Sequence, residues 1–147
     1  MKQQINEKDF RKETKYIVIH CAATPPSMDI DISTVDRWHR AKGWLGVGYH
    51  FFIKRDGTIQ EGRNVMMPGA HARGYNHCSI GVCMAGGVKE SDRVTPENNF
   101  TDAQWLALNK IINKLQQQFP DAKVVGHNEL AAKACPSFDV QAWLKSR

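Results

Sequence analysis

Two histidines and one cysteine have the types and the positions to bind a metal ion. Tyr16 to His20 and Val124 to His127 are short, largely apolar runs that each end in a histidine, and Cys135 follows eight positions after His127. Imidazole nitrogen and thiolate sulfur are ligands that zinc prefers in proteins. Three such ligands leave a fourth zinc position open for water, which is the arrangement of a catalytic site rather than a structural one.

The spacing by itself also admits a plainer interpretation. A histidine at the end of a strand can be satisfied by hydrogen bonds, and a single cysteine is most often a small buried hydrophobe. Lys133 adds a second chemical feature, because alternate residues of an extended segment point the same way and would place its ammonium beside Cys135. A nearby cation favours the thiolate form of cysteine. On spacing alone, a zinc site and a pair of structural histidines are both open.

The rest of the chain predicts a fold that brings these residues to one edge of a sheet. Lys15 to Cys21 is a nearly continuous apolar run rich in β-branched residues, the pattern of a central strand buried on both faces. If the strand at 123–127 is its neighbour, both histidines lie where open α/β sheets bind ligands. Further strands are predicted at 49–54, 58–61 and 79–84, and helices at 33–42, 101–119 and 139–144.

Turn and cap signals separate these elements. Asp56-Gly57 lies between two strand-like runs and is a strong hairpin signal. Thr101 is followed three positions later by Gln104, which predicts a capping box at the start of the longest helix. Ser33 is the predicted N-cap of the first helix. The pattern therefore predicts alternating strands and helices with one hairpin.

These elements form one unit of the α/β class. We expect a single domain over residues 15–147, a central mixed β-sheet of about five strands flanked by helices. Residues 1–14 lack periodicity and carry mixed charge, which predicts an N-terminal arm that is mobile or loosely docked. Residues 62–76 form a connection of a length that is usually functional.

Composition excludes several other classes. The 147 residues are 41% apolar and 24% charged, which is typical of a globular protein. The net charge of +5 is spread over the chain without a dense basic run, so direct nucleic-acid binding is not expected. No apolar run reaches the roughly 20 residues of a membrane helix, and the N-terminus has no signal-peptide pattern, which predicts a cytoplasmic protein without membrane insertion. Four cysteines without CxxC spacing are expected to be thiols.

Several motifs together resemble one enzyme family, the zinc-dependent N-acetylmuramoyl-L-alanine amidases, which share a fold with the peptidoglycan recognition proteins. The most similar members are the small single-domain phage endolysins, the amidase-type lysozymes of the T-odd phages. The resemblance covers roughly residues 15 to 145, with the motifs in the family's order. The motifs are Tyr16–Thr24, Gly48–Gly57, Gly74–Cys83 and Lys133–Asp139.

Carried over residue by residue, the resemblance implies a complete catalytic site. It makes His20, His127 and Cys135 the ligands of a zinc ion, and Tyr49 and Lys133 the catalytic tyrosine and lysine. The implied reaction is hydrolysis of the amide that joins the lactyl group of N-acetylmuramic acid to the L-alanine of the stem peptide. Zinc lowers the pKa of bound water toward ~7 and polarises the carbonyl, while Tyr49 and Lys133 could stabilise the oxyanion.

Other polar residues receive weaker assignments. His71, Arg73 and Asn76 lie in the long connection and are candidates for substrate contacts. His50 follows Tyr49 in a strand and should point to the opposite face, which favours a structural role. The remaining candidates are Glu129, whose plainer interpretation is a solvated or capping carboxylate, and two histidines expected to be exposed, His39 and His77.

The resemblance also defines the expected partners and the alternatives. The substrate is peptidoglycan, cleaved for host cell lysis, and the default state is a monomer. The alternative is a non-catalytic peptidoglycan-binding protein of the same fold, which would lack the ligand cysteine, so the presence of Cys135 and Lys133 favours the enzyme. Some phage members also bind and inhibit the phage's single-subunit RNA polymerase, for which the expected surface is the N-terminal arm and the helix at 33–42.

Overall fold

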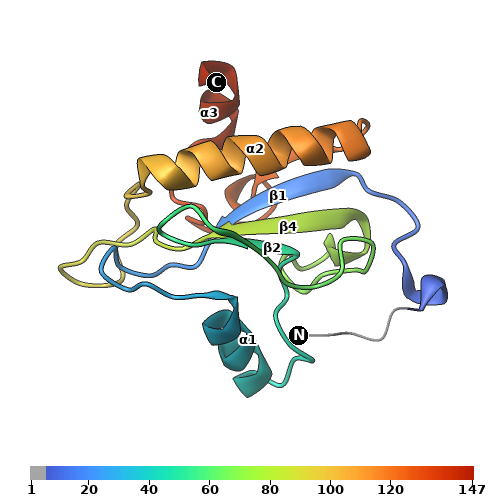
Figure 1. Cartoon of the computed structure of the whole chain (residues 1–147), viewed down its shortest axis with the longest axis horizontal. Coiled ribbons are helices and arrows are strands. Elements are labelled where there is room, and N and C mark those ends of the chain that lie inside the picture. The colour runs from blue at the N-terminus through green and yellow to red at the C-terminus, as the bar shows by residue number, and fades with distance from the viewer. Residues whose placement is uncertain (1–5) are drawn as a thin grey trace.

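In the computed structural model, which describes residues 6–147, a five-stranded sheet lies at the centre of the protein (Figure 1). The strand order is β3-β2-β4-β1-β5. β1 and β4 lie in the middle and are almost entirely buried, as their continuous apolar runs predict. The strands are β1 (Tyr16–Cys21), β2 (Phe51–Ile53), β3 (Ile59–Glu61), β4 (Ser79–Met84) and β5 (Lys123–Gly126).

The pairing of the strands confirms a mixed sheet. β1 pairs in parallel with both β4 and β5, and β2 pairs in parallel with β4. β3 is antiparallel to β2 and follows it through the predicted hairpin, where Gly57 has a φ of +88° that favours glycine. In the register of β1 and β5, Ile19 lies opposite Gly126, so the residues that follow them, His20 and His127, lie at the same edge of the sheet.

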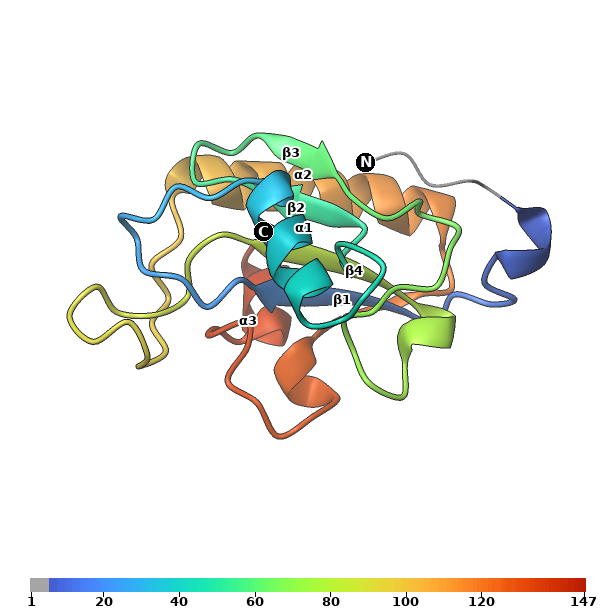
Figure 2. The ribbon, with the colours of Figure 1, turned by 90° about the horizontal axis from the view of Figure 1, so that it is seen from below.

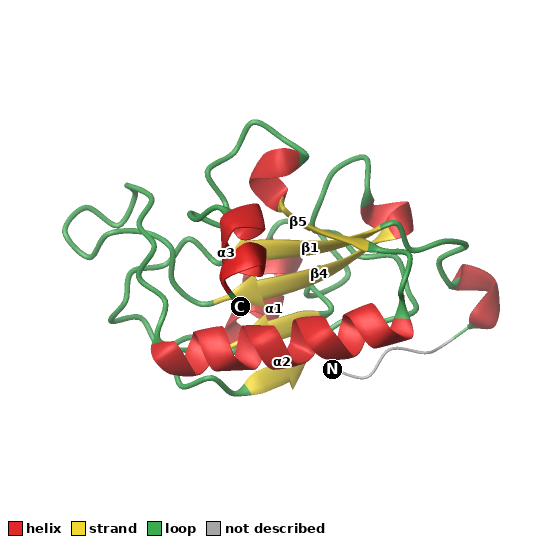
Figure 3. Cartoon of the chain, turned by 90° about the horizontal axis from the view of Figure 1, so that it is seen from above, coloured by secondary structure: helices red, strands yellow, loops and turns green. Residues whose placement is uncertain are grey.

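Helices cover both faces of the sheet. α2 (Asp102–Gln118) and α3 (Val140–Ser146) lie over one face, and α1 (Ile32–Ala41) lies over the other (Figures 1, 2 and 3). α2 buries Leu108 and Ile112 completely against the central strands. Each such side chain contributes on the order of 2 kcal/mol to the stability of the fold. The predicted layer arrangement is confirmed.

The helix caps show which local sequence signals determine where α1 and α2 begin. The predicted capping box of α2 is present, because the Gln104 backbone N–H donates to Thr101 Oγ1 at 3.1 Å and the Thr101 N–H donates to Gln104 Oε1 at 3.0 Å. The predicted cap of α1 is wrong. Asp31 caps this helix by accepting a hydrogen bond from the Thr34 N–H at 3.0 Å, and Ser33 lies inside the helix. A contact distant in sequence sets this start, since the Ile32 N–H donates to the side chain of Gln60 at 2.8 Å.

The described part of the N-terminal arm is attached to the domain through one buried residue. The Arg11 guanidinium donates to the carbonyl of Met67 at 3.0 Å, to the carbonyl of Val65, and to Thr14 Oγ1 at 3.0 Å. The Arg11 backbone N–H donates to the carbonyl of Met66 at 2.7 Å. Residues 1–5 of the predicted arm lie outside the described residues. Among the described residues, no helix has the length and the apolar character to cross a membrane.

Candidate active site

The two predicted histidine ligands lie side by side at the carboxyl edge of the sheet. His20 is near the end of β1, and His127 directly follows β5 as the first residue of a short 3-10 helix (His127–Glu129). Because β1 and β5 are parallel and in register, the two rings meet with their centroids 4.6 Å apart. Both side chains are buried.

A loop between the 3-10 helix and α3 brings Cys135 to the same place. The backbone N–H of Cys21 donates to Cys135 Sγ at 3.2 Å, and His20 Nδ1 lies 3.7 Å from the same sulfur. The candidate ligand atoms of His20, His127 and Cys135 all lie within 4.8 Å of one another. Strand register and a loop contact therefore converge on one cluster.

The cluster fits a zinc ion in its chemistry. Two imidazole nitrogens and a sulfur are a zinc donor set. His127 Nδ1 is buried and, among the described residues, has no hydrogen-bond partner. An unpaired buried polar atom costs about 1–3 kcal/mol, and a bound metal ion is one way to satisfy such a nitrogen. The three residues therefore have the chemistry and the proximity needed to hold zinc.

The electrostatics of the cluster also suit a metal. Burial, followed by the neighbouring His71 and His127, lowers the pKa of His20 well below its ordinary value. Burial and the Lys133 charge lower the pKa of His127. Both rings are therefore neutral at physiological pH, the form that binds metals. The hydrogen bond with the Cys21 side chain and burial raise the pKa of the Cys135 thiol, so a cation is needed to stabilise the thiolate.

The two predicted catalytic residues lie beside the three candidate ligands. Tyr49 lies two residues before β2, and its ring centroid is 5.0 Å from that of His20 and 5.4 Å from that of His39. Burial raises the pKa of the Tyr49 phenol well above 10, so the hydroxyl keeps its proton. Lys133 is exposed, and its charge acts on both histidines of the cluster. A proton donor and a cation thus accompany the three candidate ligands.

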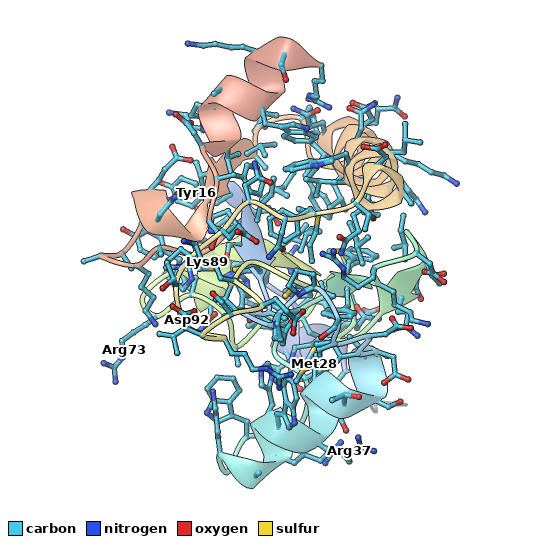
Figure 4. All side chains as sticks on the ribbon, turned by 90° about the vertical axis from the view of Figure 1, so that its left-hand side faces the viewer. Tyr16, Met28, Arg37, Arg73, Lys89 and Asp92 are labelled. Atoms are coloured by element: carbon cyan, nitrogen blue, oxygen red, sulfur yellow. The ribbon has the colours of Figure 1, made fainter. Side chains whose placement is uncertain are left out.

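The three candidates for substrate contacts are placed differently from one another. His71 is hydrogen-bonded to His20, with 2.8 Å between His71 Nδ1 and His20 Nε2. Asn76 Oδ1 accepts the backbone N–H groups of His71 and Ala72 at 2.8 and 2.9 Å, so it supports the loop from within. Arg73 is exposed and extends away from the protein (Figure 4). Their roles toward substrate stay predictions.

Other polar residues near the site are structural. His50 is buried, with Nε2 donating to the Met67 carbonyl at 2.7 Å and Nδ1 accepting from the Gly81 N–H at 3.0 Å, which confirms the predicted structural role. Glu129 accepts the Gly126 N–H at 2.6 Å, which confirms its capping interpretation. The prediction that His39 is exposed is wrong.

His39 lies on the inner side of α1. It is 7% exposed, and its Nδ1 accepts the Gly48 N–H at 2.8 Å. Its ring packs between Trp44 and Tyr49, with centroids 4.6 and 5.4 Å away. Burial lowers its pKa to about 4. His39 therefore supports the position of Tyr49, a role that the sequence pattern did not reveal.

Comparison with known proteins decides the family. The sequence matches the family model described as N-acetylmuramoyl-L-alanine amidase over residues 10–138. The chain belongs to the N-acetylmuramoyl-L-alanine amidase family. It is 45% identical to the endolysin of Enterobacteria phage K11 over 136 residues, which cover 92% of this chain and 89% of that protein.

Solved structures agree with this assignment. The N-acetylmuramoyl-L-alanine amidase LysC from Clostridium intestinale is similar with a TM-score of 0.77 and 27% identity, covering 94% of this chain and 86% of that one. Drosophila PGRP-LB shares the fold with a TM-score of 0.76 and 24% identity, covering 94% and 83%. The predicted resemblance is confirmed, and the matches indicate N-acetylmuramoyl-L-alanine amidase activity.

Proposed function

We propose that this amidase is a zinc-dependent endolysin, with His20, His127 and Cys135 as the zinc ligands. Its substrate bond is the amide between the lactyl group of N-acetylmuramic acid and the L-alanine of the stem peptide. The observation that carries the proposal is the convergence of three ligand atoms, from β1, the end of β5 and a loop, within 4.8 Å of one another. Two imidazole nitrogens and a thiolate are the donor set with which these residues would hold a catalytic zinc ion.

The metal and the residues around it would each have a separate role in the reaction. A zinc ion held by these three residues would supply Lewis acidity, which would lower the pKa of water toward about 7 and polarise the amide carbonyl. Lys133 provides a positive charge that stabilises the negative charge developing on the carbonyl oxygen. Because burial keeps the Tyr49 phenol protonated, it can donate a hydrogen bond to that oxygen or a proton to the leaving amine.

Product analysis on purified peptidoglycan tests this function. The wild type should release new free amino termini, those of L-alanine, without new reducing sugars. Cys135→Ser and the wild type with a strong chelator should release neither, while Cys78→Ser, which changes a buried cysteine away from the cluster, should behave like the wild type. New reducing sugars would show a glycosidase and overturn the assigned bond. Full activity of Cys135→Ser would exclude this ligand set.

The proposed cellular role is host cell lysis. We place synthesis of the chain, as a monomer, in the cytoplasm of the infected cell and its action on the wall after release. The similarity to phage endolysins over most of both chains supports this role. In a lysis assay, the protein added to permeabilised cells should clear the suspension, and Tyr49→Phe at equal concentration should not. Clearing by the Tyr49→Phe variant would contradict enzymatic lysis by this site.

A second proposed role is binding to a single-subunit phage RNA polymerase. Two apolar side chains of α1 and the loop after it, Trp38 and Leu45, are 41% and 86% exposed, which supports a protein-binding surface there. Part of the arm that would share this surface lies outside the described residues. Polymerase binding should fall on deletion of residues 1–10 or in Trp38→Ala, with amidase activity retained. Undiminished binding in both variants would remove this surface from consideration.

A further inference from the structure

A line of hydrogen bonds runs from the candidate ligand His20 into the protein. His20 Nε2 lies 2.8 Å from His71 Nδ1, and His71 Nε2 lies 3.2 Å from Ser79 Oγ. Ser79 Oγ in turn lies 2.7 Å from the carbonyl oxygen of Tyr75. On its other side, His20 Nδ1 faces Cys135 Sγ at 3.7 Å. The line thus begins at the cluster of candidate ligands and ends on a backbone carbonyl.

The end of the line fixes the direction of every hydrogen bond in it. A carbonyl oxygen only accepts, so the single proton of the Ser79 hydroxyl is donated to Tyr75. Ser79 Oγ must then accept from His71 Nε2–H, which in a neutral imidazole leaves His71 Nδ1 as the acceptor. That nitrogen accepts from His20 Nε2–H, so the lone pair of His20 is on Nδ1. This is the nitrogen that faces Cys135 and the metal position.

The surrounding backbone is shaped to hold the His71 ring in this position. Gly81 lies in the middle of β4, where a Cβ atom would come within 2.6 Å of the His71 ring, and a Cβ on Gly69 would come within 2.4 Å of it. Glycine inside a strand weakens it and often marks the close approach of another group. Asn76 Oδ1 also holds the backbone of His71 by accepting its N–H at 2.8 Å. The fold therefore reserves this space for an imidazole.

We infer that His71, supported by Ser79, is a positioning residue that fixes the tautomer and the ring orientation of His20. The inference rests on the proposed function, because it gives His20 the role of a metal ligand. Metal-binding histidines usually donate a hydrogen bond from the N–H of their second ring nitrogen to a carboxylate, a backbone carbonyl or water, which orients the ring. In this protein an imidazole and a hydroxyl connect the ligand to the carbonyl, so no buried carboxylate is needed.

Zinc affinity in a matched pair of variants tests the inference. Leu and Asn are similar in size, but only the Asn amide oxygen can accept from His20 in place of His71 Nδ1. In competition with a zinc chelator, His71→Leu should bind zinc roughly 10- to 100-fold more weakly than the wild type, and His71→Asn should regain much of that loss. His77→Leu, which changes an exposed histidine six positions further along the chain, should match the wild type. Equal affinity of His71→Leu and the wild type would overturn the inference.

Two further measurements separate a positioning role from a general effect on packing. Gly81→Ala leaves His71 unchanged but displaces its ring, so it should also weaken zinc binding. In long-range ¹⁵N spectra of zinc-loaded wild type, His20 and His71 should each carry their proton on Nε2. A proton on Nδ1 of His71 would overturn the inference even if every variant folds poorly. A wild type that binds no zinc would instead contradict the proposed function itself.

Discussion

His20 Nδ1 lies 3.7 Å from Cys135 Sγ, although the two residues are 115 positions apart in the chain. His20 lies near the end of β1, at the edge of the sheet. The loop before α3 places Cys135 against Cys21, the residue after His20, whose backbone N–H donates to the Cys135 sulfur. Their proximity therefore depends on the whole fold rather than on a local motif. The third candidate ligand, His127, reaches the same place because β5 runs parallel to β1.

The hydroxyl of Tyr49 is expected to act in catalysis rather than in folding. Tyr49→Phe keeps the ring against His20 and His39 and removes only the oxygen. Loss of one donor to an oxyanion typically lowers the rate on the order of 100-fold or more. Amidase assays should show such a loss with zinc content unchanged. Tyr16→Phe, at the far end of β1, serves as the control and should keep wild-type activity. A fully active Tyr49→Phe would remove the tyrosine from the mechanism.

The charge of Lys133 is predicted to matter more than its aliphatic stem. Lys133→Met keeps most of the stem and removes the ammonium that acts on His20 and His127. Its kcat should fall on the order of 100-fold, and Lys133→Arg should recover part of the loss. The matched control is Lys123→Met, an exposed lysine at the start of β5. Similar rates for Lys133→Met and this control would show that no charge is needed at that position.

Arg11 should contribute to stability because its guanidinium is buried with three acceptors, two of them carbonyls of the long loop. Arg11→Ala leaves these carbonyls without their donor, so the free energy of unfolding should fall by about 2 kcal/mol. Urea denaturation measures this change. Lys12→Ala, an exposed neighbour, is the control and should have little effect. If both variants unfold at the same urea concentration, the arm is not held by Arg11.

His50 predicts how stability depends on pH. Burial lowers its pKa to about 3, from an ordinary value of 6.5. Below pH 6.5 the His50 side chain is therefore protonated in the unfolded chain, whereas in the folded chain it stays neutral until about pH 3. The contribution of neutral His50 to the free energy of unfolding is therefore complete above pH 6.5 and is lost as the pH falls toward 3.

Urea denaturation at several pH values, with a chelator present to exclude metal effects, checks this dependence. Between about pH 7 and about pH 4, the wild type should lose up to about 3 kcal/mol through this group. His50→Gln cannot take up the proton, so its stability should change less over the same range even if it is lower throughout. Parallel curves for the two proteins would show that His50 is not responsible.

The sequence predicts the elements of this fold well because their signals are local. The apolar run of β1, the Asp56-Gly57 hairpin and the capping box at Thr101 each depend on a few neighbouring residues. The candidate ligands can be predicted because two apolar runs of the sequence end in histidine and because the motifs resemble a known family. Strand order is not local, and only the register of β1 with β5 brings His20 and His127 together.

Contacts between distant segments explain what the sequence did not predict. The Ile32 N–H donates a hydrogen bond to the side-chain oxygen of Gln60. This contact favours Asp31 over Ser33 as the N-cap of α1, although both residue types are good caps. His39 is buried by Gly48 and Tyr49, which come from a later segment. The contact of His71 with His20 had one readable signal, a glycine inside the buried strand β4, since such a glycine often marks close approach of another group.

The most direct test of the zinc-dependent site is a titration of activity with zinc. Protein stripped with a chelator should lack amidase activity on purified peptidoglycan and should regain it in proportion to added zinc, with an end point of a single ion per chain. Cys135→Ser, treated in the same way, should stay inactive at that end point. Full activity of the stripped wild type, or restoration of Cys135→Ser by the same amount of zinc, would contradict a zinc site formed by His20, His127 and Cys135.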